Sequence, residues 1–351
     1  MSIFSGIDQG FPEVQEFVSR NFGRELASVE ELDGWNSRVF KIVRKNGLCP
    51  VLVKAYAADI KNRAEVEFKA LSFLRAGGIK EVPEPLFADM DKRICAYEHI
   101  EGRKLKSEEI SRDDVEAAVS LLGKIAALSG TTKYASLPPA AESCFSIKKY
   151  DENIDIRLNR LESAAGQTGK LKRFLEEKVS VFRKEVSEYI KKGITEYGLD
   201  YEAELPCEKR FLSPSDVGFH NILRGQDGGL YFIDFEYFGW DDPVKTVSDF
   251  ILEPAVPLPE KHRKHFVESF KRMVNMDVNF KRRLSLIYPL LGLKWSLIIM
   301  NDFLPGFLRK ERQSSEQFNV HLENQLEKAE IKLEKTAREY RGFAELVEEV
   351  L

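Results

Sequence analysis

Two acids and an amide between positions 215 and 236, namely Asp216, Asn221 and Asp234, have a spacing that suits a metal-dependent active site. Asp216 lies five residues before Asn221, and Asp234 lies 13 residues after Asn221. Carboxylate and amide oxygens are the ligands that a hard cation such as Mg²⁺ prefers. Phosphoryl transfer needs such ligands on the metal, together with a carboxylate that orients the attacking hydroxyl. The set therefore predicts phosphoryl transfer, with Asp216 at the acceptor hydroxyl and Asn221 and Asp234 on the metal.

A short hairpin must hold these residues together. Residues 222–224 and 230–233 have the composition of strands, and the glycine-rich stretch 225–229 joins them. Antiparallel pairing brings the outer strand ends together, so we expect Asn221 and Asp234 to lie side by side. The alternative is a surface hairpin flanked by ordinary turn residues, because Asp and Asn are common at strand ends. Three such residues at the expected spacings favour the functional interpretation.

A second hairpin carries a lysine in an apolar strand. Residues 38–43 and 51–56 alternate as strands around a turn, and Lys54 falls near the middle of the second one. Such a lysine can simply lie on a sheet surface with its ammonium group reaching water. The helix that follows favours a functional role.

That helix is predicted from about 61 to 75, and Gly77-Gly78 end it. Glu67 lies on or beside its apolar face. A buried carboxylate needs a partner, because an unpaired buried charge costs several kcal/mol by rough estimate. We therefore expect Glu67 to pair with Lys54. Glu65 is the second candidate, since its face carries fewer large apolar residues.

Two strings in the first hairpin resemble a known family. Asn221-Ile222-Leu223 and Ile233-Asp234-Phe235-Glu236-Tyr237 are similar to segments of the aminoglycoside phosphotransferase and choline kinase family, which comprises small-molecule kinases with the protein-kinase-like fold. The family usually has His two residues before the catalytic Asp and Gly one residue before it. This chain has Pro214 and Ser215 there, while the base and both metal ligands are in place.

The resemblance implies roles for further residues and names the cofactors. Lys54 would hold the nucleotide phosphates and Glu67 would position it. Residues 33–37 would form the loop over the phosphates, although a plain β-turn is the alternative. The connector after residue 97 would present backbone groups to adenine. The implied cofactors are Mg²⁺ and ATP, with GTP as the alternative. The implied nucleotide contacts beyond the Lys54–Glu67 pair are Gly34, Asn36, Ser37, Glu98 and Ile100.

The expected fold is α+β with two lobes of the protein-kinase-like kind. A small β-rich lobe with one main helix is expected over 1–97, a connector over 98–106 and a larger, mainly helical lobe over 107–351, with the catalytic loop at 213–236. Periodic apolar positions predict further helices at 112–128, 171–197 and 314–351. The last could bind a partner or a second copy, but we expect it to cover its own core.

Composition excludes several classes of protein. A net charge of −4 provides no global field for nucleic acid. The apolar stretch 284–300 is interrupted and too short for a comfortable membrane span, so we expect a buried helix. Neither the four cysteines nor the N-terminal residues indicate secretion. We therefore expect a cytoplasmic protein, monomeric or homodimeric, with a small-molecule hydroxyl substrate as partner and with neither nucleic acid nor a membrane.

The identity of the acceptor follows less directly. The residues after Asp234 could form an acidic and aromatic wall for a cationic amino-alcohol or aminosugar; alternatively they order the loop and fill the core. They are Glu236, Tyr237, Phe238, Trp240, Asp241 and Asp242. The leading hypothesis is an ATP- and Mg²⁺-dependent phosphotransferase acting on a hydroxyl of an aminoglycoside, amino-alcohol or sugar-like molecule.

Two other functions compete with this hypothesis. One is a nucleotide-binding scaffold with weak catalysis, like a pseudokinase. Pro214, which occupies the position of the family's usual histidine, would be consistent with this function. The other is a protein kinase, which is disfavoured because no activation segment ending in Ala-Pro-Glu follows Asp234.

Overall fold

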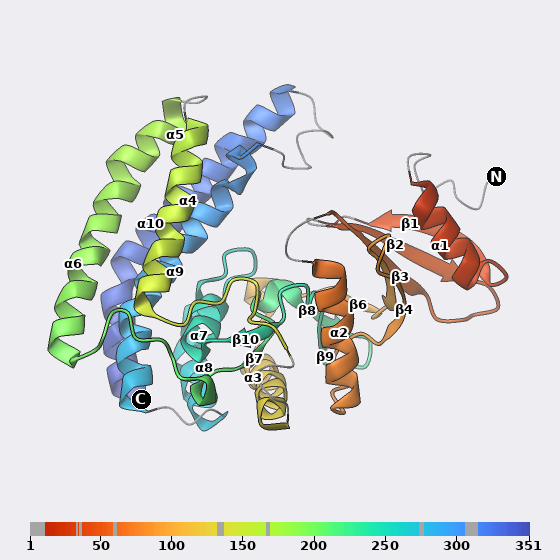
Figure 1. Cartoon of the computed structure of the whole chain (residues 1–351), viewed down its shortest axis with the longest axis horizontal. Coiled ribbons are helices and arrows are strands. Elements are labelled where there is room, and N and C mark those ends of the chain that lie inside the picture. The colour runs from red at the N-terminus through yellow and green to blue at the C-terminus, as the bar shows by residue number, and fades with distance from the viewer. Residues whose placement is uncertain are drawn as a thin grey trace. The chain divides into compact units, whose positions relative to one another are not determined.

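A computed structural model of the chain describes residues 11–32, 34, 37–58, 62–131, 137–165, 169–273, 277–305 and 315–351. It has the expected α+β class, with an antiparallel sheet in the N-terminal part and helices in the C-terminal part (Figure 1). Two compact units divide the chain. The first comprises Met1–Leu105, Lys124–Glu142 and Leu212–Trp240, and the second comprises Lys106–Gly123, Ser143–Phe211 and Asp241–Leu351.

The first unit is built on a five-stranded antiparallel sheet in the order β1-β2-β3-β5-β4. Both predicted strands of the lysine hairpin are present as β2 and β3, and Lys54 pairs with Val39 on one side and Cys95 on the other. Lys54 is therefore on the central strand of the sheet. The strands are β1 (Leu26–Leu32), β2 (Ser37–Arg44), β3 (Val51–Tyr56), β4 (Pro85–Asp89) and β5 (Ile94–Glu98).

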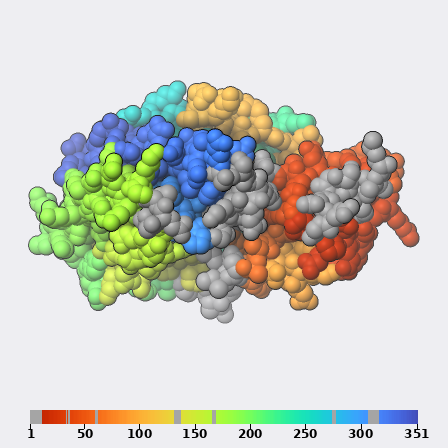
Figure 2. Space-filling view, turned by 90° about the horizontal axis from the view of Figure 1, so that it is seen from above, coloured from red at the N-terminus to blue at the C-terminus, as the bar shows by residue number. Residues whose placement is uncertain are grey.

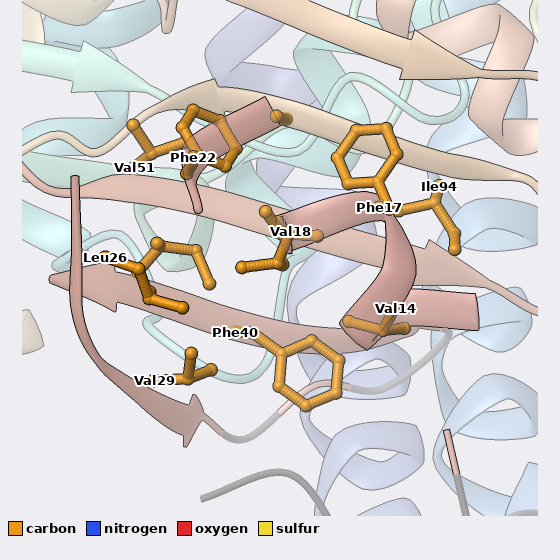
Figure 3. Close-up of a cluster of buried hydrophobic side chains, with 12 residues drawn as sticks. Val14, Phe17, Val18, Phe22, Leu26, Val29, Phe40, Val51 and Ile94 are labelled. Carbon is orange, nitrogen blue, oxygen red and sulfur yellow. The ribbon is translucent and has the colours of Figure 1, made fainter. Parts of the chain in front are cut away.

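Helix α1 (Pro12–Phe22) covers one face of this sheet. Proline at its first position suits a helix start, because the missing N–H has no intrahelical partner there. Its apolar side chains interdigitate with those of the strands in a single buried cluster (Figure 3). Each fully buried side chain of this size contributes about 1.5–3 kcal/mol. The cluster contains Val14, Phe17, Val18, Phe22, Leu26, Val29, Phe40, Ile42, Val51, Val53, Ile94 and Ala96.

Helix α2 (Arg63–Ala76) contacts β3, β4 and β5. Successive side chains of a strand point to opposite faces, so Lys54 and Tyr56 point away from the cluster that contains Val53. The helix ends as predicted: Gly78 adopts φ 85°, and the Ile79 amide donates to the Leu74 carbonyl over 3.1 Å.

A second, three-stranded sheet has the order β6-β8-β9. β6 (Gly102–Lys104) pairs with β8 (Ile222–Gly225), which pairs with β9 (Leu230–Phe232) in the predicted hairpin. The turn uses Gly228 at φ 82°, a conformation that glycine adopts without steric cost. Two further short strands, β7 (Phe211–Ser213) and β10 (Gly239–Asp241), pair with each other.

The second unit is mainly helical. The predicted helix 171–197 consists of α5, a π-helical turn and α6, and α3 and α10 match the other two predicted helices. The α-helices are α3 (Arg112–Ala127), which spans both units, α4 (Ile147–Ala165), α5 (Gly169–Phe174), α6 (Ser180–Tyr197), α7 (Pro243–Leu252), α8 (Glu260–Met273), α9 (Val278–Ile299) and α10 (Ser315–Val350). Short 3₁₀ turns occur at Ser107–Glu109, Leu128–Thr131, Cys207–Lys209, Phe219–Asn221 and Met300–Phe303.

Helix α10 packs along its own unit. It contacts α9 closely, since a side chain at Gly292 would lie 2.2 Å from Cγ2 of Thr336. Tyr340 stacks edge-on against Phe182 and donates to Glu185, both in α6. Figure 2 shows α10 in blue beside the green helices α4 to α6. The helix covers the core of its own unit, as expected.

Helix α9 contains the apolar stretch 284–300 except for Met300, which begins the 3₁₀ turn that follows. The segment Val278–Phe303 is long and apolar enough to cross a membrane, but 78% of its most apolar window is buried inside the structure. Its charged residue Lys294 forms a buried ion pair with Asp249 of α7, whose carboxylate also binds Lys245. The stretch is therefore a core helix, as predicted.

Candidate active site

Lys54 lies at the centre of a charged cluster in the first unit. Its Nζ atom is 2.9 and 3.0 Å from the two carboxylate oxygens of Glu67 and 2.9 Å from Oδ1 of Asp234. Lys54 and Glu67 are 8% and 2% exposed. The expected Lys54–Glu67 ion pair is thus present, and it is buried. The second candidate, Glu65, instead pairs with Lys69 on the surface.

The charges of this cluster keep Lys54 protonated. Burial alone would lower the pKa of its ammonium group, but the negative charges of Asp234 and Glu67 outweigh burial and raise that pKa well above its usual range. A permanent cation beside a partly exposed carboxylate can bind the anionic phosphates of a nucleotide.

Two tyrosines extend this cluster into the core. Tyr56, two residues after Lys54 on the same strand face, donates to Oε2 of Glu67 over 2.5 Å. The hydroxyl of Tyr97 lies 2.9 Å from that of Tyr56, and the Phe235 amide donates to Oε1 of Glu67 over 3.3 Å. Sequence reasoning missed both tyrosines. The strand pattern could have identified them. Tyr56 lies two residues after Lys54, and Tyr97 lies two residues after Cys95, the strand partner of Lys54, so both side chains share the sheet face of Lys54.

The hairpin delivers Asp234 to this cluster. The Ile233 amide donates to the Asn221 carbonyl over 2.9 Å, so the two outer strand ends are joined, and Asp234 follows directly. Asp234 has φ 68°, in the left-handed region that few residues other than glycine adopt. Such conformations persist where the surrounding structure determines them, and they are frequent at active sites.

Asp216 lies on a tightly folded loop before Asn221. The Asp216 amide donates to the Pro214 carbonyl over 2.9 Å, which closes a γ-turn around Ser215 at φ 68°. The Asn221 side-chain amide donates to Oδ2 of Asp216 over 3.2 Å, and Nε2 of His220 lies 3.2 Å from Oδ1. Asp216, Asn221 and Asp234 all belong to the first unit, as Lys54 does.

Glu236 is a buried carboxylate next to this site. It pairs with Arg63 at 3.3 Å, and Arg63 lies 5.2 Å from the ring centre of Tyr237. Burial, together with the charge of Asp234, raises the pKa of Glu236 to about 8. Glu67, Asp234 and Glu236 each present an oxygen within 4.8 Å of the others. The site is rich in the hard oxygen donors that Mg²⁺ prefers.

The other predicted nucleotide contacts occupy loops and strand ends. Gly34 approaches the Ser37 carbonyl so closely that a side chain there would lie 2.2 Å from it. Ser37 begins β2, Glu98 ends β5, and Ile100 lies between β5 and β6. Asn36 lies outside the residues that the structure describes.

Most residues of the proposed acidic and aromatic wall have structural roles. Phe238 and Trp240 are buried core residues. Asp242 caps α7 by accepting the Val244 amide over 3.0 Å and pairs with Arg283. Asp241 pairs with Lys245 in the core. The interpretation as loop-ordering and core residues is correct for these four.

Comparison with protein-family models matches residues 28–251 to the phosphotransferase enzyme family. The chain belongs to this family. This membership confirms the expected enzyme class, a small-molecule kinase with an alcohol group as acceptor. A search of curated proteins finds no match.

Solved structures with the same fold include three kinases of small molecules. Choline kinase LicA from Streptococcus pneumoniae is 17% identical, with 92% of this chain and 99% of that chain covered and a TM-score of 0.58. Spectinomycin phosphotransferase APH(9)-Ia, in complex with ADP and spectinomycin, is 15% identical, with 91% and 97% covered and a TM-score of 0.61. Choline kinase from Cryptosporidium parvum Iowa II is 14% identical, with 92% and 96% covered and a TM-score of 0.57. The expected protein-kinase-like fold is therefore confirmed.

Proposed function

We propose that the protein transfers the γ-phosphoryl group of ATP, in the presence of Mg²⁺, to a hydroxyl group of a small molecule. The observation that carries this proposal is the position of Lys54 Nζ, 2.9 Å from both Glu67 and Asp234. That contact joins a strand lysine, a helix carboxylate and the acid after the hairpin, three parts that phosphoryl transfer requires. Asp216 supplies the carboxylate for the acceptor hydroxyl, and Asn221 supplies the second ligand for the metal.

Lys54 binds the nucleotide phosphates, and Glu67 positions it. Backbone and side-chain groups of Gly34, Asn36 and Ser37 cover the phosphates, and backbone groups of Glu98 and Ile100 bind the base. Similar structures that hold ADP or AMP support nucleotide binding by this fold. ATP is the proposed donor, and GTP is the alternative.

Asn221 and Asp234 would hold the metal, and the donor set fits this role. Asp234 offers a carboxylate whose side chain is 37% exposed, and Asn221 offers a neutral amide oxygen. Bound Mg²⁺ supplies positive charge that neutralises the phosphates during transfer. Asp216 accepts a hydrogen bond from the acceptor hydroxyl and holds the hydroxyl oxygen in line with the γ-phosphorus. This positioning lowers the entropic part of the barrier, because the two reacting groups no longer have to meet at random in solution.

An aminoglycoside, an amino-alcohol or a sugar-like molecule is the proposed acceptor class. Choline kinases and aminoglycoside phosphotransferases among the similar structures support this class. Of the proposed wall, the half-buried Tyr237 remains a candidate for contact with a cationic acceptor, whereas Glu236 is buried against Arg63. We place the protein in the cytoplasm as a monomer or homodimer that uses neither nucleic acid nor a membrane. Its lobes are proposed at 1–97 and 107–351, joined by 98–106.

The test compares Asp216→Asn with Asp227→Asn, a matched change at an exposed site in the turn between β8 and β9. Purified variants are incubated with labelled Mg·ATP and a panel of small hydroxyl compounds. Asp216→Asn should lower the transfer rate by about 10²- to 10⁴-fold, the usual contribution of such a group. Asp227→Asn should keep the wild-type rate. Transfer by Asp216→Asn at the wild-type rate would refute the role of Asp216.

The same assay separates the competing functions. Nucleotide binding by calorimetry without transfer to any acceptor would support a scaffold. Label that moves to protein, when cell extract replaces the panel, would support a protein kinase.

A further inference from the structure

We infer that His220 is a positioning residue that fixes the carboxylate of Asp216 for transfer, an inference that rests on the proposed function. Nε2 of His220 lies 3.2 Å from Oδ1 of Asp216, and the two side chains are 17% and 32% exposed. In the Nε2-protonated form the imidazole donates a hydrogen bond to that oxygen. His220 is the single histidine between residues 213 and 236.

Two different side chains hold the two oxygens of Asp216. Asn221 Nδ2 donates to Oδ2, while His220 contacts Oδ1. A carboxylate held through one oxygen can still pivot about that bond, whereas contacts at both oxygens fix its plane. Each carboxylate oxygen accepts about two hydrogen bonds, so both retain capacity for the acceptor hydroxyl.

The contact from His220 leaves Asn221 able to serve the metal. The Asn221 amide has one oxygen for a cation and one NH₂ group for Asp216. If Asn221 shifts when a metal binds, its hold on Oδ2 weakens, but His220 still holds Oδ1. The histidine thus holds Asp216 at a second carboxylate oxygen, in addition to the one that Asn221 contacts.

The backbone around His220 is itself held in place. Residues Phe219–Asn221 form a 3₁₀ turn, and Phe219 is 1% exposed. Lys104 of β6 donates to the His220 carbonyl over 2.8 Å. On the other side of Asp216, the γ-turn at Ser215 fixes the incoming chain, and Pro214 offers no side-chain donor. The imidazole contact to Asp216 therefore comes from a residue that follows it in the chain and whose backbone is fixed.

This arrangement predicts a selective kinetic effect. His220 contacts Asp216, whereas the groups that hold Lys54 are Glu67 and Asp234. Loss of the imidazole should therefore lower kcat while leaving nucleotide affinity intact. A misplacement of about 1 Å in a catalytic group can cost about 10²-fold in rate.

The experiment uses two variants of the full chain. His220→Leu keeps much of the side-chain volume and removes the donor, whereas His220→Gln places an amide N–H at similar reach. His262→Leu is the matched control, because His262 contacts the Ile110 carbonyl in the second unit. For each variant we would measure kcat, the Kd of Mg·ADP by calorimetry and the crystal structure.

His220→Leu should lower kcat by about 10- to 100-fold, with the Kd of Mg·ADP within twofold of wild type, and its crystal structure should show Asp216 rotated. His220→Gln should restore kcat to within about threefold and return Asp216 to its place. Wild-type kcat in His220→Leu, or an equal loss in His220→Gln and His220→Leu, would overturn the inference. If the wild type itself transfers no phosphate, the proposed function fails, and the Asp216 rotamer in the crystal structures still decides the role of His220.

Discussion

Tyr56 donates its phenolic hydrogen to Oε2 of Glu67 over 2.5 Å, on the carboxylate that also binds Lys54. The two residues are 5% and 2% exposed. A buried carboxylate with several donors keeps its position, whereas loss of one donor leaves part of its charge unsatisfied. The orientation of Lys54 therefore depends on a hydroxyl group that does not touch it.

Tyr56→Phe should lower the free energy of unfolding by about 1–3 kcal/mol, the usual cost of leaving a buried acceptor unsatisfied. It should also weaken Mg·ATP binding, because Glu67 holds Lys54 less firmly. Urea denaturation and calorimetry measure the two effects. Tyr97→Phe is the matched control, since Tyr97 reaches the Tyr56 hydroxyl but not Glu67. Equal loss of nucleotide affinity in both variants would contradict the role of Tyr56.

Glu67→Gln and Glu65→Gln test the same chemical change at two places on α2. Glu67→Gln removes the buried one of the two charges that neutralise Lys54, and loss of one partner of a buried pair costs about 3–5 kcal/mol. Glu65 pairs with Lys69 on the surface, where an ion pair contributes about 0–1 kcal/mol. Nucleotide affinity should fall in Glu67→Gln and stay unchanged in Glu65→Gln. The interpretation fails if the two variants bind Mg·ATP equally well.

Ser215→Val should damage the Asp216 loop, because a β-branched residue is strongly disfavoured at φ 68°. Ser215→Gly should keep the loop, since glycine adopts this conformation freely and the strain of about 1–2 kcal/mol disappears. Transfer rate and thermal stability measure the difference. Comparable activity in the two variants would show that the γ-turn does not position Asp216.

Lys332 of α10 should make stability depend on pH. It donates to the Leu252 carbonyl at the end of α7. Burial lowers its pKa to about 7, the charges of Lys335 and Arg263 act in the same direction, and those of Glu253 and Glu339 oppose them. The unfolded chain keeps the usual lysine pKa and binds more protons above pH 7, so stability should rise with pH between the folded and unfolded pKa values.

Lys332→Met should remove this dependence. Relative to the variant, the wild type should gain about 2 kcal/mol between pH 7 and pH 9. Urea denaturation at several pH values checks the prediction. Lys328→Met, an exposed change on the same helix, should leave the slope as it is in the wild type. If the free energy of unfolding of the wild type and that of Lys332→Met change with pH in the same way, the proposed effect of Lys332 is refuted.

Local patterns predicted the elements that carry the chemistry. Strand alternation and turn glycines located the hairpin before Asp234, and apolar spacing placed Glu67 on the inward face of its helix. The partners of these residues were harder to predict. Tyr56 and His220 act through contacts that depend on side-chain direction and loop geometry, which spacing does not encode. Helix α1 was not predicted, because its few apolar residues are stabilised mainly by packing against the sheet, which the local sequence does not reveal.

The left-handed backbone at Asp234 also limits which residue types can replace it. Asparagine, aspartate and glycine tolerate this conformation far better than glutamate does. In the genetic code the codons of asparagine and glycine are each one base change from those of aspartate. Descendants of this gene could therefore lose the carboxylate that is proposed to hold the metal in a single mutational step while the loop kept its shape. Inactive but well-folded relatives are an accessible outcome of its evolution.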